Sequence, residues 1–243
     1  KPSESATATR IKTESRGERE GLTNSGPLEH SGRKPRIVAI GGGTGLSVML
    51  RGLKKKPVDI TAVVTVADDG GSSGRLRDEM QMPPPGDIRS VITALAESEP
   101  LLSEMLQYRF TNGTGLAGHS LGNLILAALR DITGDFVTGV RELSRVLAVR
   151  GKVLPASHDS IVLMAKMKDG TVVQGESKIT KYGGRIERVF LKEPDVKPLP
   201  EAVEAIRAAD VIVLGPGSLY TSVLPNLLVP GITEAIRASA ASA

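Results

Sequence analysis

The sequence has no cysteine and no tryptophan, and only three tyrosines and three phenylalanines among 243 residues. The lack of cysteine excludes disulfides, thiolate metal sites and cysteine nucleophiles. No apolar run approaches the roughly 20 residues that cross a bilayer, and no signal-peptide pattern opens the chain. The net charge of +4 is modest and stacking aromatics are scarce, which argues against nucleic-acid binding. We therefore expect a cytoplasmic protein without a membrane span and without a nucleic-acid partner.

Residues 1–35 are rich in Ser, Thr, Gly, Glu and Arg and hold few sizeable apolar side chains. Such a segment cannot bury enough surface to offset the entropy lost on ordering. We predict a disordered N-terminal tail over residues 1–35 and a single domain over residues 36–243. A hydrophobic content of 40% is enough for a substantial aliphatic core in that domain.

The domain opens with an apolar run, a glycine turn and an amphipathic helix. Arg36–Ile40 predicts a buried strand, and apolar residues at helical spacing over 46–53 predict the helix. Asp59–Val66 predicts a second buried strand, which completes a right-handed βαβ unit. A polar loop is expected over Asp68–Arg77, and Asp87 is expected to cap a helix over Ile88–Ala96.

Further helices are predicted around Pro100–Arg109, Leu121–Ile132 and Phe136–Val149. The pattern then changes to an antiparallel excursion over residues 160–191, with an Asp169-Gly170 hairpin turn. A helix over Pro200–Ala209 and a strand over Asp210–Leu214 restore the parallel pattern. The fold class is therefore α/β, a Rossmann-like, doubly wound, mainly parallel sheet with a β-hairpin-rich insertion.

Glycines fill the turn between the first strand and the first helix. Backbone N–H groups in such a turn approach an anion closely, and the helix dipole adds positive potential. A phosphate cradle is the favoured interpretation, and a tight turn without a ligand is the alternative. The turn is not a Walker loop, because no Lys follows the last glycine, and Leu46 breaks the dinucleotide fingerprint. The candidate residues are Gly41, Gly42, Gly43, Thr44 and Gly45.

A second polar segment follows the second strand, at the edge where open α/β sheets bind ligands. Asp68 and Asp69 are suited either to a ribose or to Mg²⁺ beside phosphate oxygens. Ser72, Ser73 and Arg75 add hydroxyl and guanidinium donors. The alternative is a plain solvated turn.

Two more segments hold candidate ligand contacts. His119 and Asn123 begin an apolar helix, where His119 is either a ligand contact or base, or a structural hydrogen-bonding residue. A small-residue turn follows the last strand and precedes a helix, and two such turns at one sheet edge suit a diphosphate. The alternative for this turn is a well-capped helix. Its candidate residues are Gly217, Ser218, Leu219, Tyr220, Thr221 and Ser222.

These segments, in this order, resemble the YvcK-type gluconeogenesis factor family of the CofD-like superfamily, which includes 2-phospho-L-lactate transferase. The resemblance runs from about Arg36 to about Ile236. The matching stretches are Ala39–Leu46, Thr65–Arg77, Pro85–Arg89, Gly118–Leu124 and Gly215–Ser222.

The resemblance implies a cytoplasmic regulator that binds a nucleotide sugar, UDP-N-acetylglucosamine, and supports cell shape and growth on gluconeogenic carbon. It implies that the glycine loop and Gly217–Ser222 hold the diphosphate, and that Asp68 and Asp69 lie near ribose, phosphates or metal. Asp87 joins the candidate ligand contacts as part of the Pro85–Arg89 stretch. The transferase relatives use Mg²⁺ and a nucleotide-activated phospholactate. Family members run on past the helix near Ile232, so we expect the family's C-terminal part to be missing.

Three functions compete at this stage. The first is a nucleotide-sugar-binding regulator that requires no cofactor and assigns no catalytic residue. The second is a Mg²⁺-dependent transferase acting on a nucleotide diphosphate, with Asp68 or Asp69 at the metal. The third, an NAD-type dehydrogenase, is disfavoured by the incomplete fingerprint and the second phosphate turn. The absence of a nucleophile–base pair favours the regulator, and a homo-oligomer is compatible with the sequence.

Overall fold

A computed structural model describes residues 32–242 of the chain. From Lys34 onward the chain forms one compact unit. Most of the predicted N-terminal tail, residues 1–31, lies outside the described residues. Within the described residues, no helix is both long enough and apolar enough to span a membrane.

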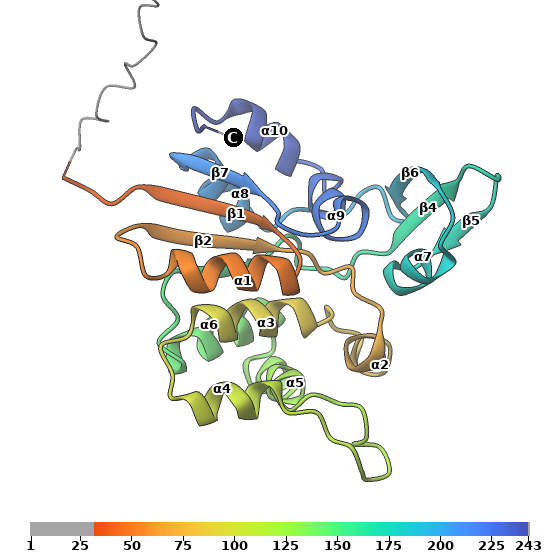
Figure 1. Ribbon diagram of the computed structural model, residues 1–243, viewed down its shortest axis with the longest axis horizontal. Coiled ribbons are helices and arrows are strands. Elements are labelled where there is room, and N and C mark those ends of the chain that lie inside the picture. Colours follow the sequence, from red (N-terminus) through yellow and green to blue (C-terminus); the bar gives the residue numbers. More distant parts are fainter. Residues whose placement is uncertain (1–31, 243) are drawn as a thin grey trace, which may run out of the picture. The chain divides into compact units, whose positions relative to one another are not determined.

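A four-stranded parallel sheet forms the centre of the domain, in the order β3-β2-β1-β7 (Figure 1). Strands β1 (Arg36–Gly41), β2 (Asp59–Val64) and β7 (Val211–Leu214) were predicted, and β2 ends two residues earlier than expected. Strand β3 (Lys152–Pro155) was not predicted, because Lys152 and Pro155 leave only two apolar residues between them, too few for a strand signal. Since β1 pairs with both β2 and β7, the turns after β1 and β7 leave the same edge side by side.

Alternate residues of the central strands pack into two different cores. Ala39 of β1 lies in one core with α1 (Thr44–Leu53) and α3 (Gly86–Leu95), whereas Val38 and Ile40 face the other core with α8 (Pro200–Arg207) and α10 (Ile232–Ala238). Helices therefore cover both faces, which confirms the doubly wound arrangement.

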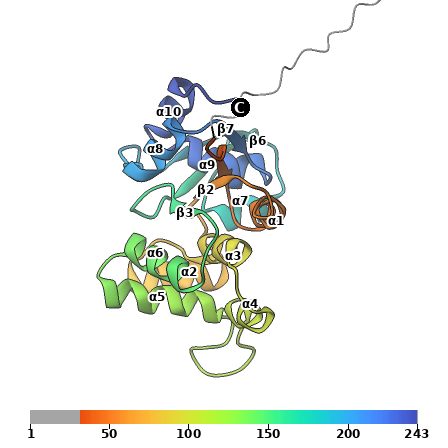
Figure 2. The ribbon, with the colours of Figure 1, turned by 90° about the vertical axis from the view of Figure 1, so that its left-hand side faces the viewer.

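A further helical layer extends the first of these cores. Helix α6 (Phe136–Val146) lies near the sheet with α1 and α3. Helices α4 (Pro100–Gln107) and α5 (Leu121–Thr133) pack beyond that layer (Figure 2). All three helices lie where the apolar spacing predicted them, within a few residues.

The predicted antiparallel excursion is a three-stranded sheet in the order β5-β4-β6. Its strands are β4 (Leu163–Met167), β5 (Val172–Gln174) and β6 (Ile186–Leu191), and the Asp169-Gly170 turn joins the first two. Helix α7 (Glu176–Tyr182) follows β5 and was not predicted. Ile179 is its single buried residue, so the segment has no helical stripe to detect.

Two local predictions were wrong. The expected polar loop Asp68–Arg77 contains most of helix α2 (Gly71–Met80). The helix forms despite its glycines because Asp68 Oδ1 accepts the N–H of Gly70 at 2.9 Å and because Ser72, Ser73 and Leu76 are buried. Asp87 is not an N-cap: α3 begins at Gly86, two residues before the expected start at Ile88, and its capping position is Pro85.

The chain after β7 returns across the same sheet edge. A π-helical turn (Leu219–Val223) begins at Ser218, whose side chain accepts the N–H of Thr221 at 3.4 Å. Helix α9 (Leu224–Leu227) and then α10 follow. Beyond α10, Ser242 forms an isolated parallel bridge with Val211.

Candidate functional site

The two predicted turns meet at the carboxyl edge of the parallel sheet. A Cβ atom placed on Gly41 would lie 3.8 Å from the Cα of Gly215, and one on Gly45 would lie 2.6 Å from the Pro216 carbonyl oxygen. A Cβ atom placed on Gly42 would lie 3.0 Å from the Ser222 hydroxyl oxygen. Glycine is needed at Gly45, because there the backbone of the second turn leaves no room for a side chain.

The Asn226 side chain links these two turns by hydrogen bonds. Its Nδ2 donates to the Gly41 carbonyl at 3.2 Å and to the Ser222 carbonyl at 2.8 Å. The side chain is fully buried, so these bonds are shielded from water. Asn226 lies just after the last predicted site segment, and no role was predicted for it.

Part of the glycine loop is buried and contacts an acidic side chain. Gly41, Gly42 and Gly43 are buried, and the Asp87 carboxylate accepts the backbone N–H of Gly43. An ideal Cβ on Gly43 would collide with Asp87 Oδ1. Burial, together with the nearby Asp68 and Glu176 carboxylates, raises the pKa of Asp87 to about 7, against the opposing effects of the Gly43 hydrogen bond and Arg89. One amide of the predicted cradle is thus already bound to an acidic side chain.

Three carboxylates converge beside this loop. Asp68, Asp69 and Glu176 each place an oxygen within 4.8 Å of the others. Asp69 Oδ1 also accepts the N–H of Ser177 at 2.8 Å, which ties the end of β2 to the start of α7. Burial raises the pKa of Glu176, and Asp68 adds to the rise. The donor set fits a hard divalent cation such as Mg²⁺, which prefers carboxylate oxygens.

Ser72 is the centre of a buried hydrogen-bond network. Its Oγ accepts from Asn123 Nδ2 at 3.1 Å and from the Ser120 N–H at 3.3 Å. Its remaining contact is His119 Nδ1 at 3.0 Å, so the hydroxyl proton is directed to that nitrogen. Burial lowers the pKa of His119, which agrees with a neutral ring accepting at Nδ1. The network holds His119 and Asn123 against α2, where their exposed fractions are 4% and 2%.

A polar cavity of about 360 Å³ lies between the glycine loop, α2 and α3. It gathers several predicted residues, together with Arg89, Ser90 and Arg109, to which no role was assigned. Arg89 lies in the Pro85–Arg89 stretch, whereas Arg109 lies in a loop without a motif. The predicted residues that line the cavity are Thr44, Asp68, Ser72, Ser73, Asp87 and Asn123.

Some predicted residues lie at the margin of this arrangement. Arg75 donates to the Ala117 carbonyl at 2.8 Å and so fixes the loop before α5. Leu219 and Tyr220 are exposed on the turn after β7. Thr221 hydrogen-bonds the Glu176 carboxylate, which connects that turn to the acidic cluster.

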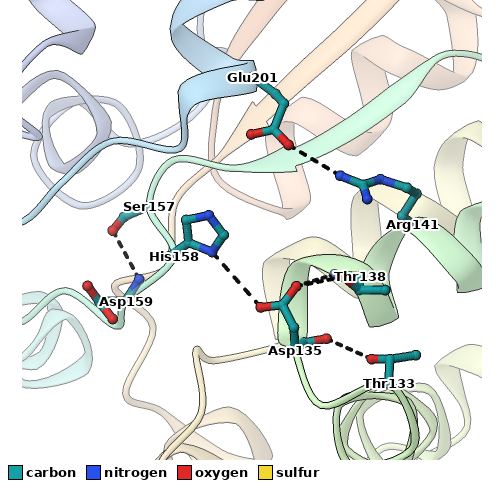
Figure 3. A network of polar contacts seen from close by, with 8 residues as sticks. All are labelled: Thr133, Asp135, Thr138, Arg141, Ser157, His158, Asp159 and Glu201. Carbon is teal, nitrogen blue, oxygen red and sulfur yellow. Dashed lines mark hydrogen bonds and ion pairs between the residues drawn. The ribbon is translucent and has the colours of Figure 1, made fainter.

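A larger hollow of about 830 Å³ lies at the amino end of the strands, between α6, α8 and β3. The Arg141–Glu201 ion pair, 3.3 Å long, joins α6 to α8 there (Figure 3). Arg150 is paired with Glu97 at 3.6 Å, so part of the positive charge is already neutralised. His158, expected in a surface turn, is exposed and has Nδ1 4.0 Å from Asp135 Oδ1 (Figure 3). None of the predicted ligand contacts lines this hollow.

These observations define a Rossmann-like α/β protein with two small-residue turns in contact at the carboxyl edge of its sheet. The family described as 2-phospho-L-lactate transferase CofD matches residues 37–243. The chain belongs to this CofD family.

Named relatives are similar over most of this chain. The gluconeogenesis factor of Halalkalibacterium halodurans is 67% identical over 209 residues, covering 86% of this chain and 65% of that protein. The gluconeogenesis factor of Bacillus subtilis is 65% identical over 205 residues, covering 84% and 65%. A crystal structure of a Bacillus halodurans protein matches with a TM-score of 0.84 and 67% identity, over 86% of this chain and 67% of that one. The chain therefore spans 65% of the length of these two curated relatives.

Proposed function

We propose that this chain binds a nucleotide diphosphate, specifically a nucleotide sugar of the UDP-N-acetylglucosamine type. In this role it acts as a cytoplasmic regulator that supports growth on gluconeogenic carbon and cell shape. The names of its relatives support the metabolic part. The observation that carries the binding part is the direct contact of the two turns, Gly41–Gly45 and Gly215–Ser222, at one sheet edge.

The local chemistry supports a diphosphate at this edge. α1 begins at Thr44 without a side-chain cap, so the first N–H groups of that helix lack a partner from a capping side chain. Thr44 is exposed and lines the polar cavity, and Ser218 offers a hydroxyl group from the second turn. Amides and hydroxyls that converge from two turns suit two linked phosphates better than one.

A thermal-shift panel tests this proposal. The ligands are UDP, UDP-N-acetylglucosamine, GDP and NAD, each with and without Mg²⁺. A ligand at about 100 times its dissociation constant stabilises the folded state by roughly 2.7 kcal/mol. We expect UDP-N-acetylglucosamine to give the largest shift. Equal shifts for NAD, or no shift with any nucleotide, would contradict the proposal.

A second candidate function is a Mg²⁺-dependent transferase, and the Asp68–Asp69–Glu176 cluster favours it. These carboxylates would hold the ion, which would offset negative charge on phosphate oxygens. Incubation with UDP-sugar and Mg²⁺, followed by chromatography, separates the two functions. Unchanged ligand supports the regulator. Released UDP that disappears in Asp68→Asn supports the transferase.

A further inference from the structure

Two guanidinium groups line the polar cavity without an acidic partner. Arg89 Nε donates to Asn123 Oδ1 at 3.0 Å, and its Nη2 donates to Ser90 Oγ at 3.2 Å. Arg109 Nη1 donates to the Gly118 carbonyl. Both residues line the cavity, and within residues 32–242 neither has a carboxylate oxygen within the 4.0 Å of an ion pair.

This arrangement places two guanidinium groups that form no ion pair within residues 32–242 beside one cavity, which the Asp68 and Asp87 carboxylates also line. Arg89 is partly buried, and burial lowers its pKa. Arg109 lowers that pKa further, while Asp87 and Asp68 act in the opposite direction from a longer range. A guanidinium has five N–H groups, and the neutral partners of Arg89 use only two of them. Within residues 32–242 the remaining N–H groups of Arg89 have no hydrogen-bond partner, and the Arg89 residue lines the cavity.

The rest of this wall also favours an anion. Ser72 and Ser73 lie in the first turn of α2, which is ten residues long and has no side-chain cap. Its unsatisfied amides and dipole add to the field of the two guanidiniums. Asp68 and Asp87 line the same cavity and offset part of this field.

We propose that Arg89 and Arg109 hold an oxyanion, the phosphate or carboxylate group of a small second ligand. Guanidinium groups bind either group through paired, charge-assisted hydrogen bonds. A volume of about 360 Å³ is enough for a small phosphorylated or carboxylated molecule. This pocket adjoins the first diphosphate turn through Thr44 and Asp87. The inference does not depend on the nucleotide proposal, because Arg89 and Arg109 lie outside both turns.

Titration of the full chain with inorganic phosphate, and separately with acetate, tests this pocket. Calorimetry or thermal shift at constant ionic strength gives the affinities. We expect Arg109→Gln to weaken binding of the preferred anion at least tenfold, and Arg89→Gln to weaken it further. Arg109 is exposed, so its variant tests the pocket even if Arg89→Gln does not fold. Arg51→Gln, on the exposed side of α1 and outside the cavity, is the matched control and should bind normally.

Gly45→Ala separates this pocket from the diphosphate turns. The substitution places a methyl group against the Pro216 carbonyl and leaves Arg89 and Arg109 intact. Phosphate binding that survives Gly45→Ala and is lost in Arg109→Gln supports the pocket. A phosphate preference identifies a phosphorylated ligand, and an acetate preference a carboxylated one. No binding of either anion, or unchanged binding by Arg109→Gln, would overturn the inference.

Discussion

The Asp87 carboxylate accepts the backbone N–H of Gly43, so an acidic side chain occupies part of the loop expected to receive phosphate. Asp87 lies in the first turn of α3, and Gly43 lies immediately before α1. A phosphate that uses the same amide has to displace this carboxylate or bind while it is protonated. Protonation of Asp87 therefore controls the charge that an incoming phosphate meets.

The first prediction concerns pH and Asp87. Its pKa is raised from 3.8 to about 7, so between about pH 4 and pH 7 the folded state holds a proton that the unfolded state has released. The contribution of Asp87 to the free energy of unfolding is therefore largest below about pH 4. It decreases as the pH rises from about 4 to about 7. The rise of about three pH units corresponds to on the order of 4 kcal/mol.

Asp87→Asn removes this titration. Urea unfolding at several pH values measures the free energy of unfolding of the wild type and the variant. From pH 4 to pH 8 the wild type should lose stability relative to the variant. Nucleotide binding by the wild type should weaken over the same range, and binding by the variant should not. Asp78→Asn, on the exposed side of α2, is the control. If the free energies of unfolding of wild type and Asp87→Asn changed equally with pH, the raised pKa would be refuted.

The second prediction compares two glycines of α1. A Cβ at Gly45 would lie 2.6 Å from the Pro216 carbonyl oxygen, whereas one at Gly52 would meet no atom within 4 Å. Gly45→Ala should separate the two turns, weaken nucleotide binding at least tenfold and cost about 1–3 kcal/mol of stability. Gly52→Ala should stabilise the helix by up to about 1 kcal/mol and leave binding unchanged. If calorimetric titration gave the same nucleotide affinity for both variants, the contact between the two turns would not contribute to binding.

The third prediction concerns Asn226. Replacement by Ala leaves the Gly41 and Ser222 carbonyls without their shared donor in a buried place. We expect a loss of about 1–3 kcal/mol in the free energy of unfolding. Nucleotide affinity should also fall, because the two turns are no longer joined. Asn112→Ala, in an exposed loop, should change neither quantity. A variant that keeps full stability would show that Asn226 does not hold the turns together.

The fourth prediction separates two roles of Asp69. Its Oδ1 accepts the N–H of Ser177 in the first turn of α7, and its charge belongs to the acidic cluster. Asp69→Ala should lose about 1 kcal/mol, as for other helix-capping side chains. Asp69→Asn keeps an acceptor oxygen and should recover most of that stability, but not the affinity for Mg²⁺. Thermal unfolding with and without Mg²⁺ measures both effects, and equal instability of the two variants would rule out the capping role.

Strong local patterns explain which parts of the fold were predictable. The apolar runs of β1, β2 and β7 and the stripe of α5 are visible without any tertiary information. Helix α2 was missed because Gly71 and Gly74 argue for a loop. It is stabilised from outside by the Asp68 hydrogen bond to Gly70 and by the close approach of Gly74 to the Asp69 backbone. Propensity alone cannot register such contacts.

The site was predictable where its residues lie in small-residue motifs. The contact between the turns after β1 and β7 follows from strands that are adjacent in a parallel sheet. Glu176 could not be found, because it follows a three-residue strand and reaches Asp68 only through the antiparallel excursion. Arg109 could not be found either, because only the folded loop before α5 brings it to the cavity beside Arg89.

The small antiparallel sheet reaches the acidic cluster through the first turn of α7. Glu176 and Ser177 make these contacts, while the Asp169-Gly170 hairpin tip is exposed. One residue added or removed between Gly175 and Ser177 would rotate Glu176 away from Asp68 and Asp69. The tip is tied to the far end of α7, where the Tyr182 hydroxyl donates to Asp169 Oδ2 at 2.6 Å, so changes at the tip should disturb the carboxylates less. Natural sequence variation in this excursion should therefore accumulate at its far end and be restricted where it joins the site.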